Sequence, residues 1–207
     1  MLAPCRLGRT GRSAQHADRK TNEMDLTGKL LIAMPGIGDP RFEHSVVFLC
    51  SHSEEGAMGL IVNKTAPEVK LGSLLEQLEI KADPEAAALP VRFGGPVETQ
   101  RGFVLHSDEY ESRVNSLEIP GGFAMTATLD ILEDIAEGRG PDKLTVMLGY
   151  AGWGPGQLEG EIVANGWLTA EASAELLFDM ADLDKWEAAL RSLGVDPVSL
   201  SASAGTA

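Results

Sequence analysis

Residues 148–168 read LGYAGWGPGQLEGEIVANGWL, and this stretch decides how the chain folds. It overlaps a short apolar run with β-branched residues over 145–148, which predicts a buried strand that ends near Tyr150. The glycines that follow indicate left-handed backbone or close contacts between backbone segments. We expect a helix over 157–162 and a further strand over 163–168.

A strand, a glycine-rich turn and a helix start are also typical of phosphate-binding loops. Here Gly154, Gly156 and Gly160 give G-x-G-x-x-x-G, which is one residue longer than the dinucleotide fingerprint, and the Gly-Lys-Ser/Thr ending of a P-loop is absent. Glu159 and Glu161 would lie near the positive end of the helix and repel a phosphate. We therefore favour a structural turn packed by the two tryptophans of the stretch.

The charge of the chain limits its partners. The chain has 207 residues, of which 43% are hydrophobic and 23% are charged, and this composition predicts one globular domain. Its net charge is −14, and residues 1–23 carry +3, which leaves −17 for the rest. A body this acidic repels nucleic acids and anionic membranes, and no apolar run approaches the ~20 residues of a membrane helix. We expect neither membrane binding nor direct nucleic-acid binding.

Residues 1–23 show no hydrophobic periodicity and lack the apolar segment of a secretory signal. An arginine-rich, acid-poor start is also typical of organelle transit peptides. We favour translation from Met24, which a good strand soon follows, and expect 1–23 to be a disordered extension. The domain is then expected over 24–199, with a loose tail over 200–207.

Cysteine usage indicates the compartment. Cys5 lies in the expected extension and Cys50 in an expected strand, so the two do not make a disulfide framework. Free thiols fit a reducing environment, and we expect a cytoplasmic protein.

The connections between the elements indicate the fold class. Residues 45–51 are apolar through their middle, which predicts a central strand covered on both faces, and a short turn predicts an antiparallel hairpin with 57–62. Ser73 with Glu76, and Asp184 with Glu187, match helix capping boxes. Such short hairpin connections favour an α+β single domain with a large mixed, mostly antiparallel sheet and flanking helices. Further strands are expected over 29–34, 90–93, 102–106, 115–119 and 123–126, and helices over 73–78 and 128–138 and after Thr169 and Asp184.

Seven blocks of sequence carry a family resemblance. They are GKLLIAMP (28–35), FEHSVVFLC (42–50), GAMGLIVNK (56–64), FGGPV (93–97), RGFVLH (101–106), LGYAGWGPGQL (148–158) and EIVANGWL (161–168). With these blocks the chain resembles the YqgE/AlgH family of bacterial proteins over about 26–178. The resemblance implies a single α+β domain with a large mixed sheet in the bacterial cytoplasm. Some members are labelled transcriptional regulators, chiefly through a link to alginate control, and the resemblance supplies no catalytic residue or cofactor.

Cys50 and His52 are candidates for a nucleophile and its base, because they share one face of an expected strand. Residues two apart on such a face lie roughly 6.5–7 Å from each other, whereas a nucleophile and its base need ~2.6–3.2 Å. We therefore favour a buried structural cysteine.

Histidines offer the candidate metal ligands. His44, His52 and His106 could combine with Asp39 or Glu43, but their spacing matches no zinc motif. We favour surface or hydrogen-bonded histidines.

Three arginines, Arg92, Arg101 and Arg113, lie near the turn at 94–96. Clustered arginines bind carboxylates or phosphates, but they also form internal ion pairs. Ion pairs with Glu98, Asp108 or Glu111 are the simpler expectation.

Two functions stay open. The first is a non-enzymatic regulatory or protein-interaction module, whose glycine- and tryptophan-rich loops contact an unidentified protein partner. Direct DNA binding is not expected, since no helix-turn-helix with a basic recognition helix is present. The alternative is a small-molecule binder or enzyme with a site between the loops at 94–97 and 152–156. The candidate ligand or partner surface comprises Arg92, Gly94, Gly95, Arg101, His106, Trp153 and Gly154, and we assign no catalytic, cofactor-binding or metal-binding residue.

Overall fold

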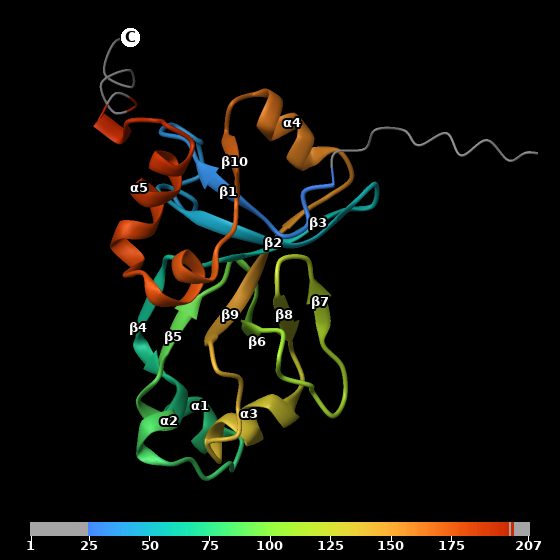
Figure 1. Ribbon diagram of the computed structural model, residues 1–207, viewed down its shortest axis with the longest axis vertical. Coiled ribbons are helices and arrows are strands. Elements are labelled where there is room, and N and C mark those ends of the chain that lie inside the picture. Colours follow the sequence, from blue (N-terminus) through green and yellow to red (C-terminus); the bar gives the residue numbers. More distant parts are fainter. Residues whose placement is uncertain (1–24, 199, 201–207) are drawn as a thin grey trace, which may run out of the picture.

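The structure, a computed structural model, describes residues 25–198 and residue 200 (Figure 1). The expected extension over 1–23 and, apart from Leu200, the expected tail over 200–207 lie outside the described residues. Within the described part, no helix is both long and apolar enough to cross a membrane.

The described residues form one α+β domain, as the sequence predicts. The strands are β1 (Lys29–Ala33), β2 (Val46–Ser53), β3 (Gly56–Ile61), β4 (Thr65–Lys70), β5 (Pro90–Phe93), β6 (Val97–Ser107), β7 (Leu117–Ile119), β8 (Phe123–Thr126), β9 (Leu144–Trp153) and β10 (Trp167–Glu171). The helices are α1 (Leu71–Gln77), α2 (Pro84–Ala88), α3 (Leu129–Ala136), α4 (Gln157–Val163), the π-helix η1 (Glu175–Asp179) and α5 (Asp182–Ser192).

Strand β9 joins the two halves of the molecule (Figure 1). The sheet follows the order β10-β1-β2-β3-β9-β6-β8-β7, and every neighbouring pair in it is antiparallel. Strand β5 pairs in parallel with β9 and antiparallel with β4. One edge of β9 therefore pairs with β5 over 146–148 and with β3 over 151–153, while the other edge pairs with β6. The predicted mixed, mostly antiparallel sheet is confirmed.

Along one edge of β9 the pairing partner changes from β5 to β3, and Gly94 and Gly95 lie at this change. The Gly94 N–H donates to the Leu148 carbonyl, and the Gly94 carbonyl accepts from the Ile61 N–H, both at 2.8 Å. A Cβ atom at Gly95 would lie 2.1 Å from the carbonyl carbon of Tyr150, and the φ angle of Gly95 is +154°. Glycine is required here because the two backbones lie in direct contact.

Both faces of the sheet are covered, so the hydrophobic core has three parts. In β2, Val46 and Phe48 face the interior of the curled sheet, where α5 packs, whereas Val47 and Leu49 face α4. A third cluster lies between the sheet and α1, α2 and α3. These contacts confirm the expectation that 45–51 belongs to a central strand covered on both faces.

Helix α5 is held on the sheet by two buried side chains. The Nζ atom of Lys185 donates to the carbonyl oxygens of Val62 at 2.9 Å and Leu177 at 3.0 Å. The indole Nε1 of Trp186 donates to the Ala33 carbonyl at 2.8 Å. Every buried donor in this contact has an acceptor, as packing a polar group in a core requires.

Some helix and strand starts differ from the sequence prediction. Ser73 lies inside α1, whose N-cap is Lys70, and Asp184 lies inside α5, whose N-cap is Ala181. Both predicted capping boxes are therefore wrong, because each observed N-cap lies three residues before the predicted one and makes no side-chain hydrogen bond. The strand predicted over 163–168 begins only at Trp167, since α4 takes up the first of these residues and a turn follows.

The contact at Gly95 predicts opposite effects for two glycine substitutions. Gly95→Ala forces the chain away from β9 and should lower the free energy of unfolding by about 3 kcal/mol. Gly160→Ala is the matched control, because a Cβ atom on this helical glycine meets no atom within 4 Å. It should raise the free energy of unfolding by about 0.5–1 kcal/mol. Urea unfolding measures both values, and equal effects would contradict the close approach.

Candidate functional site

A hollow of about 560 Å³ opens where the two glycine-rich loops meet. Its walls come from the β1–β2 loop, the loops at 94–97 and 152–156, α4 and the turn from α4 to β10. We call it the aromatic hollow. It lies between the two loops where the sequence analysis places the alternative binding site.

Three aromatic side chains form a fixed wall of the aromatic hollow. The ring centroid of Phe42 lies 5.5 Å from that of Trp167 and 6.4 Å from that of Trp153. The two indoles meet edge to face, with their centroids 5.9 Å apart, an arrangement that the charge distribution of aromatic rings favours. Both indoles are almost fully buried, so their positions are set by the core.

One carboxylate connects this wall to α4. Glu161 Oε2 accepts hydrogen bonds from the indole N–H groups of Trp153 at 2.9 Å and Trp167 at 2.8 Å. Glu161 Oε1 accepts a hydrogen bond from the side-chain amide of Gln157 at 2.9 Å. All three donors are neutral, and Glu161 makes no ion pair with any described residue. Its negative charge is therefore held beside the hollow by hydrogen bonds alone.

The other charged side chains in the lining neutralise each other. Arg41 donates to Asp39 through Nε at 3.0 Å and through Nη2 at 2.7 Å, which makes a two-point ion pair. The hydrogen bonds from Arg41 hold the pKa of Asp39 below its ordinary value. Because this pair carries no net charge, Glu161 sets the sign of the charge in the aromatic hollow.

Helix α4 is fixed to the sheet by His52. The His52 Nδ1 atom accepts from the Leu26 N–H at 3.2 Å, so Nε2 carries the proton and donates to Glu159 Oε1 at 2.8 Å. The candidate nucleophile–base pair, which the sequence analysis does not favour, does not form, because both ring nitrogens of His52 are occupied. Burial raises the pKa of the Cys50 thiol, whose sulfur has the Phe48 carbonyl as its neighbour. The expectation of a buried cysteine is confirmed.

Two residues of the predicted surface lie at or beside the aromatic hollow. Trp153 lines it, and the Gly154 N–H donates to the side chain of Gln157 at its rim. Gly94 and Gly95 are buried against β9 and offer no open surface.

Arg101 faces a neighbouring hollow of about 640 Å³ that shares Gly152 and Trp153 with the aromatic hollow. Its Nη1 donates to Glu98 at 3.0 Å, and its guanidinium carbon lies 5.1 Å from the centre of the Phe103 ring. The side chain is thus already paired and stacked at the sheet surface.

Arg92 and His106 lie away from both hollows. Arg92 Nε donates to the carboxylate of Asp182 at 3.0 Å and thereby ties β5 to α5. His106 is fully buried, where Nδ1 donates to the Ser107 carbonyl at 2.8 Å and Nε2 accepts from the Thr126 hydroxyl at 2.9 Å. Burial lowers the pKa of His106.

The three candidate arginines make separate ion pairs, with Asp182 for Arg92, Glu98 for Arg101 and Glu133 for Arg113. They therefore form no single anion site, and Glu98 is the one partner that the sequence predicts correctly. No group of three or more His, Cys, Asp or Glu side chains in the described part of the chain is placed to hold a metal ion.

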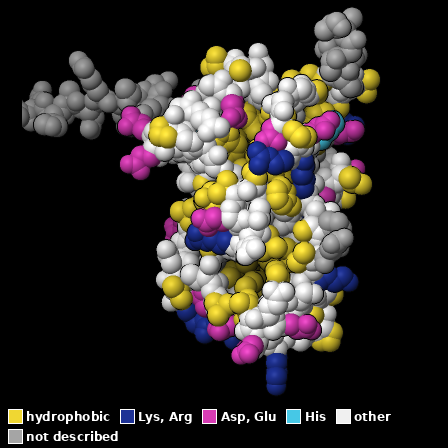
Figure 2. Space-filling view, turned by 180° about the vertical axis from the view of Figure 1, so that it is seen from behind, with side chains coloured by type: hydrophobic (Ala, Val, Ile, Leu, Met, Phe, Trp, Pro, Cys, Tyr) yellow, Lys and Arg dark blue, Asp and Glu magenta, His cyan; other side chains and the backbone are white. Residues whose placement is uncertain are grey.

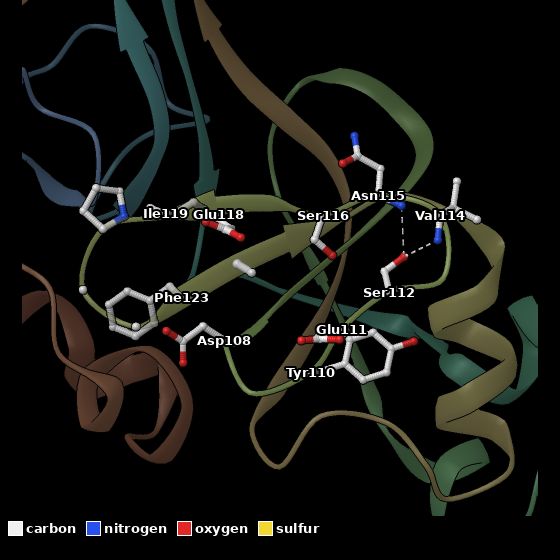
Figure 3. A pocket seen from close by; sticks show the side chains of 14 residues that line it. Asp108, Tyr110, Glu111, Ser112, Val114, Asn115, Ser116, Glu118, Ile119 and Phe123 are labelled. Atoms are coloured by element: carbon white, nitrogen blue, oxygen red, sulfur yellow. Dashed lines mark hydrogen bonds between the residues drawn. The ribbon is translucent and has the colours of Figure 1, made fainter.

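A larger hollow, about 860 Å³, lies between the loop over 108–116 and the β7–β8 hairpin (Figure 3). The Ser112 hydroxyl accepts the backbone N–H groups of Val114 and Asn115 at 3.2 Å, so it stabilises the loop itself. The carboxylates at its rim are exposed to solvent. We place the candidate site in the aromatic hollow instead, because its carboxylate is fixed by three hydrogen bonds beside a rigid wall.

Comparison with known proteins identifies the family. The AlgH-like family model matches residues 30–198. The chain belongs to the AlgH-like family. This confirms the resemblance that the sequence blocks indicate.

Two similar relatives are UPF0301 proteins. One from Ruegeria pomeroyi is 65% identical over 89% of this chain and 100% of the relative, and one from Paracoccus denitrificans is 56% identical over 88% and 97%. The solution structure of AlgH from Pseudomonas aeruginosa is 39% identical, with a TM-score of 0.74 over 96% of this chain and 100% of that chain. A crystal structure of a Corynebacterium diphtheriae protein, 24% identical, has a TM-score of 0.66 over 89% and 96%, and shows the fold alone.

Sequence reasoning finds Trp153 and Gly154 but misses Phe42 and Glu161 as parts of one site. Phe42 lies far from α4 in the chain, and only the sheet brings it to the tryptophans. The one signal for Glu161 is an acidic residue between two tryptophans of a glycine-rich stretch.

Glu161→Ala should destabilise the fold by about 2–4 kcal/mol, because two buried indole N–H groups lose their acceptor. Glu161→Gln should cost less than about 1 kcal/mol, since the amide oxygen still accepts from both indoles. Glu171→Ala, which removes an exposed partner of Lys29, is the control and should change stability by less than about 0.5 kcal/mol. Urea unfolding followed by circular dichroism measures all three. Equal values for Glu161→Ala and Glu171→Ala would show that the indole hydrogen bonds do not stabilise the fold.

Buried His106 predicts that the free energy of unfolding falls as the pH drops below the ordinary histidine pKa of about 6.5. The unfolded chain, with an ordinary histidine pKa of about 6.5, takes up a proton before the folded chain does, because burial lowers the pKa of His106. Its contribution to stability is thus complete above the unfolded pKa and is lost as the pH falls. His106→Gln should reduce the slope of unfolding free energy against pH. The same slope in the wild type and in His106→Gln would contradict the assignment.

Proposed function

We propose that the protein is a non-enzymatic interaction module of the cytoplasm, which regulates a protein partner that docks at the aromatic hollow. One observation supports this most strongly: the half-buried Phe42 ring and the half-buried Glu161 carboxylate, both in contact with two nearly buried indoles, line a hollow between two loops. Aromatic side chains with fixed positions are typical of the residues that contribute most to binding.

The described side chains do not assemble a catalytic group at this hollow. Of the candidates for catalysis, Cys50 is buried, and His52 and His106 each use both ring nitrogens in hydrogen bonds. A general base needs a ring nitrogen within reach of its substrate. The binding proposal therefore fits these residues better than an enzyme does.

Exposed apolar side chains support a macromolecular partner. Val163, at the end of α4 beside the hollow, is 83% exposed. Figure 2 shows further hydrophobic side chains gathered over the middle of one face. Exposed apolar patches mark interaction surfaces in soluble proteins.

Some family members are labelled transcriptional regulators. Under this proposal, the chain would regulate transcription indirectly, by binding the protein partner. The net charge of −14 opposes direct contact with DNA, whose affinity for proteins depends on neutralising its phosphates.

A small-molecule binder is the second candidate, and the position of the aromatic hollow between the loops at 94–97 and 152–156 favours it. A volume of about 560 Å³ suits a small organic ligand.

Partner capture tests the proposal. The full chain with a C-terminal tag, purified from its own cytoplasm at low salt after nuclease treatment, should retain a stoichiometric protein. Ala164→Arg adds a long side chain to the lining of the hollow and should abolish capture, whereas Ala88→Arg, on an exposed position of α2, should not. Equal capture by both variants would show that the partner does not dock at the hollow. A clean preparation without a partner would contradict the interaction module, and a thermal-shift screen of metabolites would then test the second candidate.

A further inference from the structure

The geometry of Glu161 points to what the aromatic hollow recognises: we infer that it binds the ammonium group of a lysine side chain presented by the partner protein. This inference rests on the proposed function and adds the chemistry of recognition to it.

The first argument is the uncompensated charge. Glu161 is half-buried, and its three hydrogen-bond donors, two indoles and one amide, are neutral. A carboxylate that is partly removed from water is stabilised further by a cation, and no described side chain supplies one. The other acid of the lining, Asp39, already holds Arg41. A cationic group that enters the hollow therefore meets one unpaired negative charge.

The second argument is the number of acceptor positions. A carboxylate offers about four lone-pair positions, two on each oxygen. On Glu161, Oε2 uses both of its positions for Trp153 and Trp167, and Oε1 uses one for Gln157. One position is left, on Oε1. A single N–H donor fits it, whereas the two-point pairing that arginine prefers requires a free position on both oxygens.

The third argument is the shape of the wall. Phe42 is half-buried and lines the hollow beside the two nearly buried indoles, so the aliphatic part of a lysine packs mainly against the Phe42 ring. Aromatic rings also attract a nearby ammonium group. The exposed apolar Val163 beside the rim adds contact area outside the hollow, which favours a lysine carried by a protein over a free amine. The net charge of −14 draws basic partners toward the chain.

Three model compounds test the inference on the full-length protein: the Nα-acetyl N-methylamides of lysine, norleucine and arginine. Norleucine has a linear apolar side chain and lacks the ammonium group. The readout is the indole N–H signals in ¹⁵N NMR. Trp186 provides an internal control, because its indole donates to the Ala33 carbonyl within the core, away from Glu161.

The lysine compound should shift the Trp153 and Trp167 indole signals in a saturable way, with a dissociation constant on the order of millimolar. The Trp186 signal should not move. The norleucine and arginine compounds should bind at least about tenfold more weakly than the lysine compound. In the Glu161→Gln variant, the affinity for the lysine compound should fall by about the same factor, which corresponds to the loss of one charge-assisted contact.

Several outcomes would overturn the inference. Equal binding of the norleucine and lysine compounds would show that the hollow recognises only the apolar part of the side chain. Stronger binding of the arginine compound would show that Glu161 has more than one free acceptor position. Absence of any shift with lysine would refute a lysine site in this hollow. Partner capture separates this failure from failure of the proposed function. If Ala164→Arg abolishes capture and Glu161→Gln leaves it unchanged, the partner docks at the hollow without the lysine contact.

Discussion

The Glu161 carboxylate accepts a hydrogen bond from each of two indoles, and the arrangement of the aromatic hollow depends on this interaction. Trp153 ends β9 and Trp167 begins β10, so one side chain of α4 links the strand at the centre of the sheet to the strand at its edge. A shared charged acceptor fixes both rings more firmly than two separate neutral bonds, because hydrogen bonds to an ionised group are stronger. Together with the burial of both indoles in the core and the hydrogen bond from His52 to Glu159, this interaction holds the aromatic wall against α4.

Glu161 differs from the ion-paired charged groups of the domain. Arg92, Arg101 and Arg113 each hold an acidic partner, and the buried Lys185 lies 3.1 Å from Asp182. The pair of Arg92 with Asp182 ties β5 to α5, whereas the pair of Arg101 with Glu98 lies within β6. Glu161 is held by neutral donors only, which leaves its charge available to a ligand. The contrast supports the proposed binding role of the aromatic hollow.

Sequence patterns predict the local elements of this fold better than its site. The apolar stretch at 45–51 correctly predicts a strand that is buried on both faces. This inference depends only on the strand's own composition and not on which strands lie beside it. Helix α2 is missed because Pro84 resembles a stop signal, although it follows the N-cap Asp83, whose side chain accepts from the Ala86 N–H. Strand β4 contains a proline, which is tolerated because the strand pairs only with β5. The site joins Phe42 to residues more than a hundred positions later, and only the strand order decides that contact.

Hydrogen exchange of the indole N–H groups tests the central claim most directly, because it reports on the shared acceptor itself. The account predicts that the Trp153 and Trp167 indoles exchange slowly in the wild type and much faster in Glu161→Ala, while the Trp186 indole, bonded to the Ala33 carbonyl, exchanges at the same rate in both. Rapid exchange of Trp153 and Trp167 in the wild type, or an unchanged rate in the variant, would show that Glu161 does not organise the aromatic hollow.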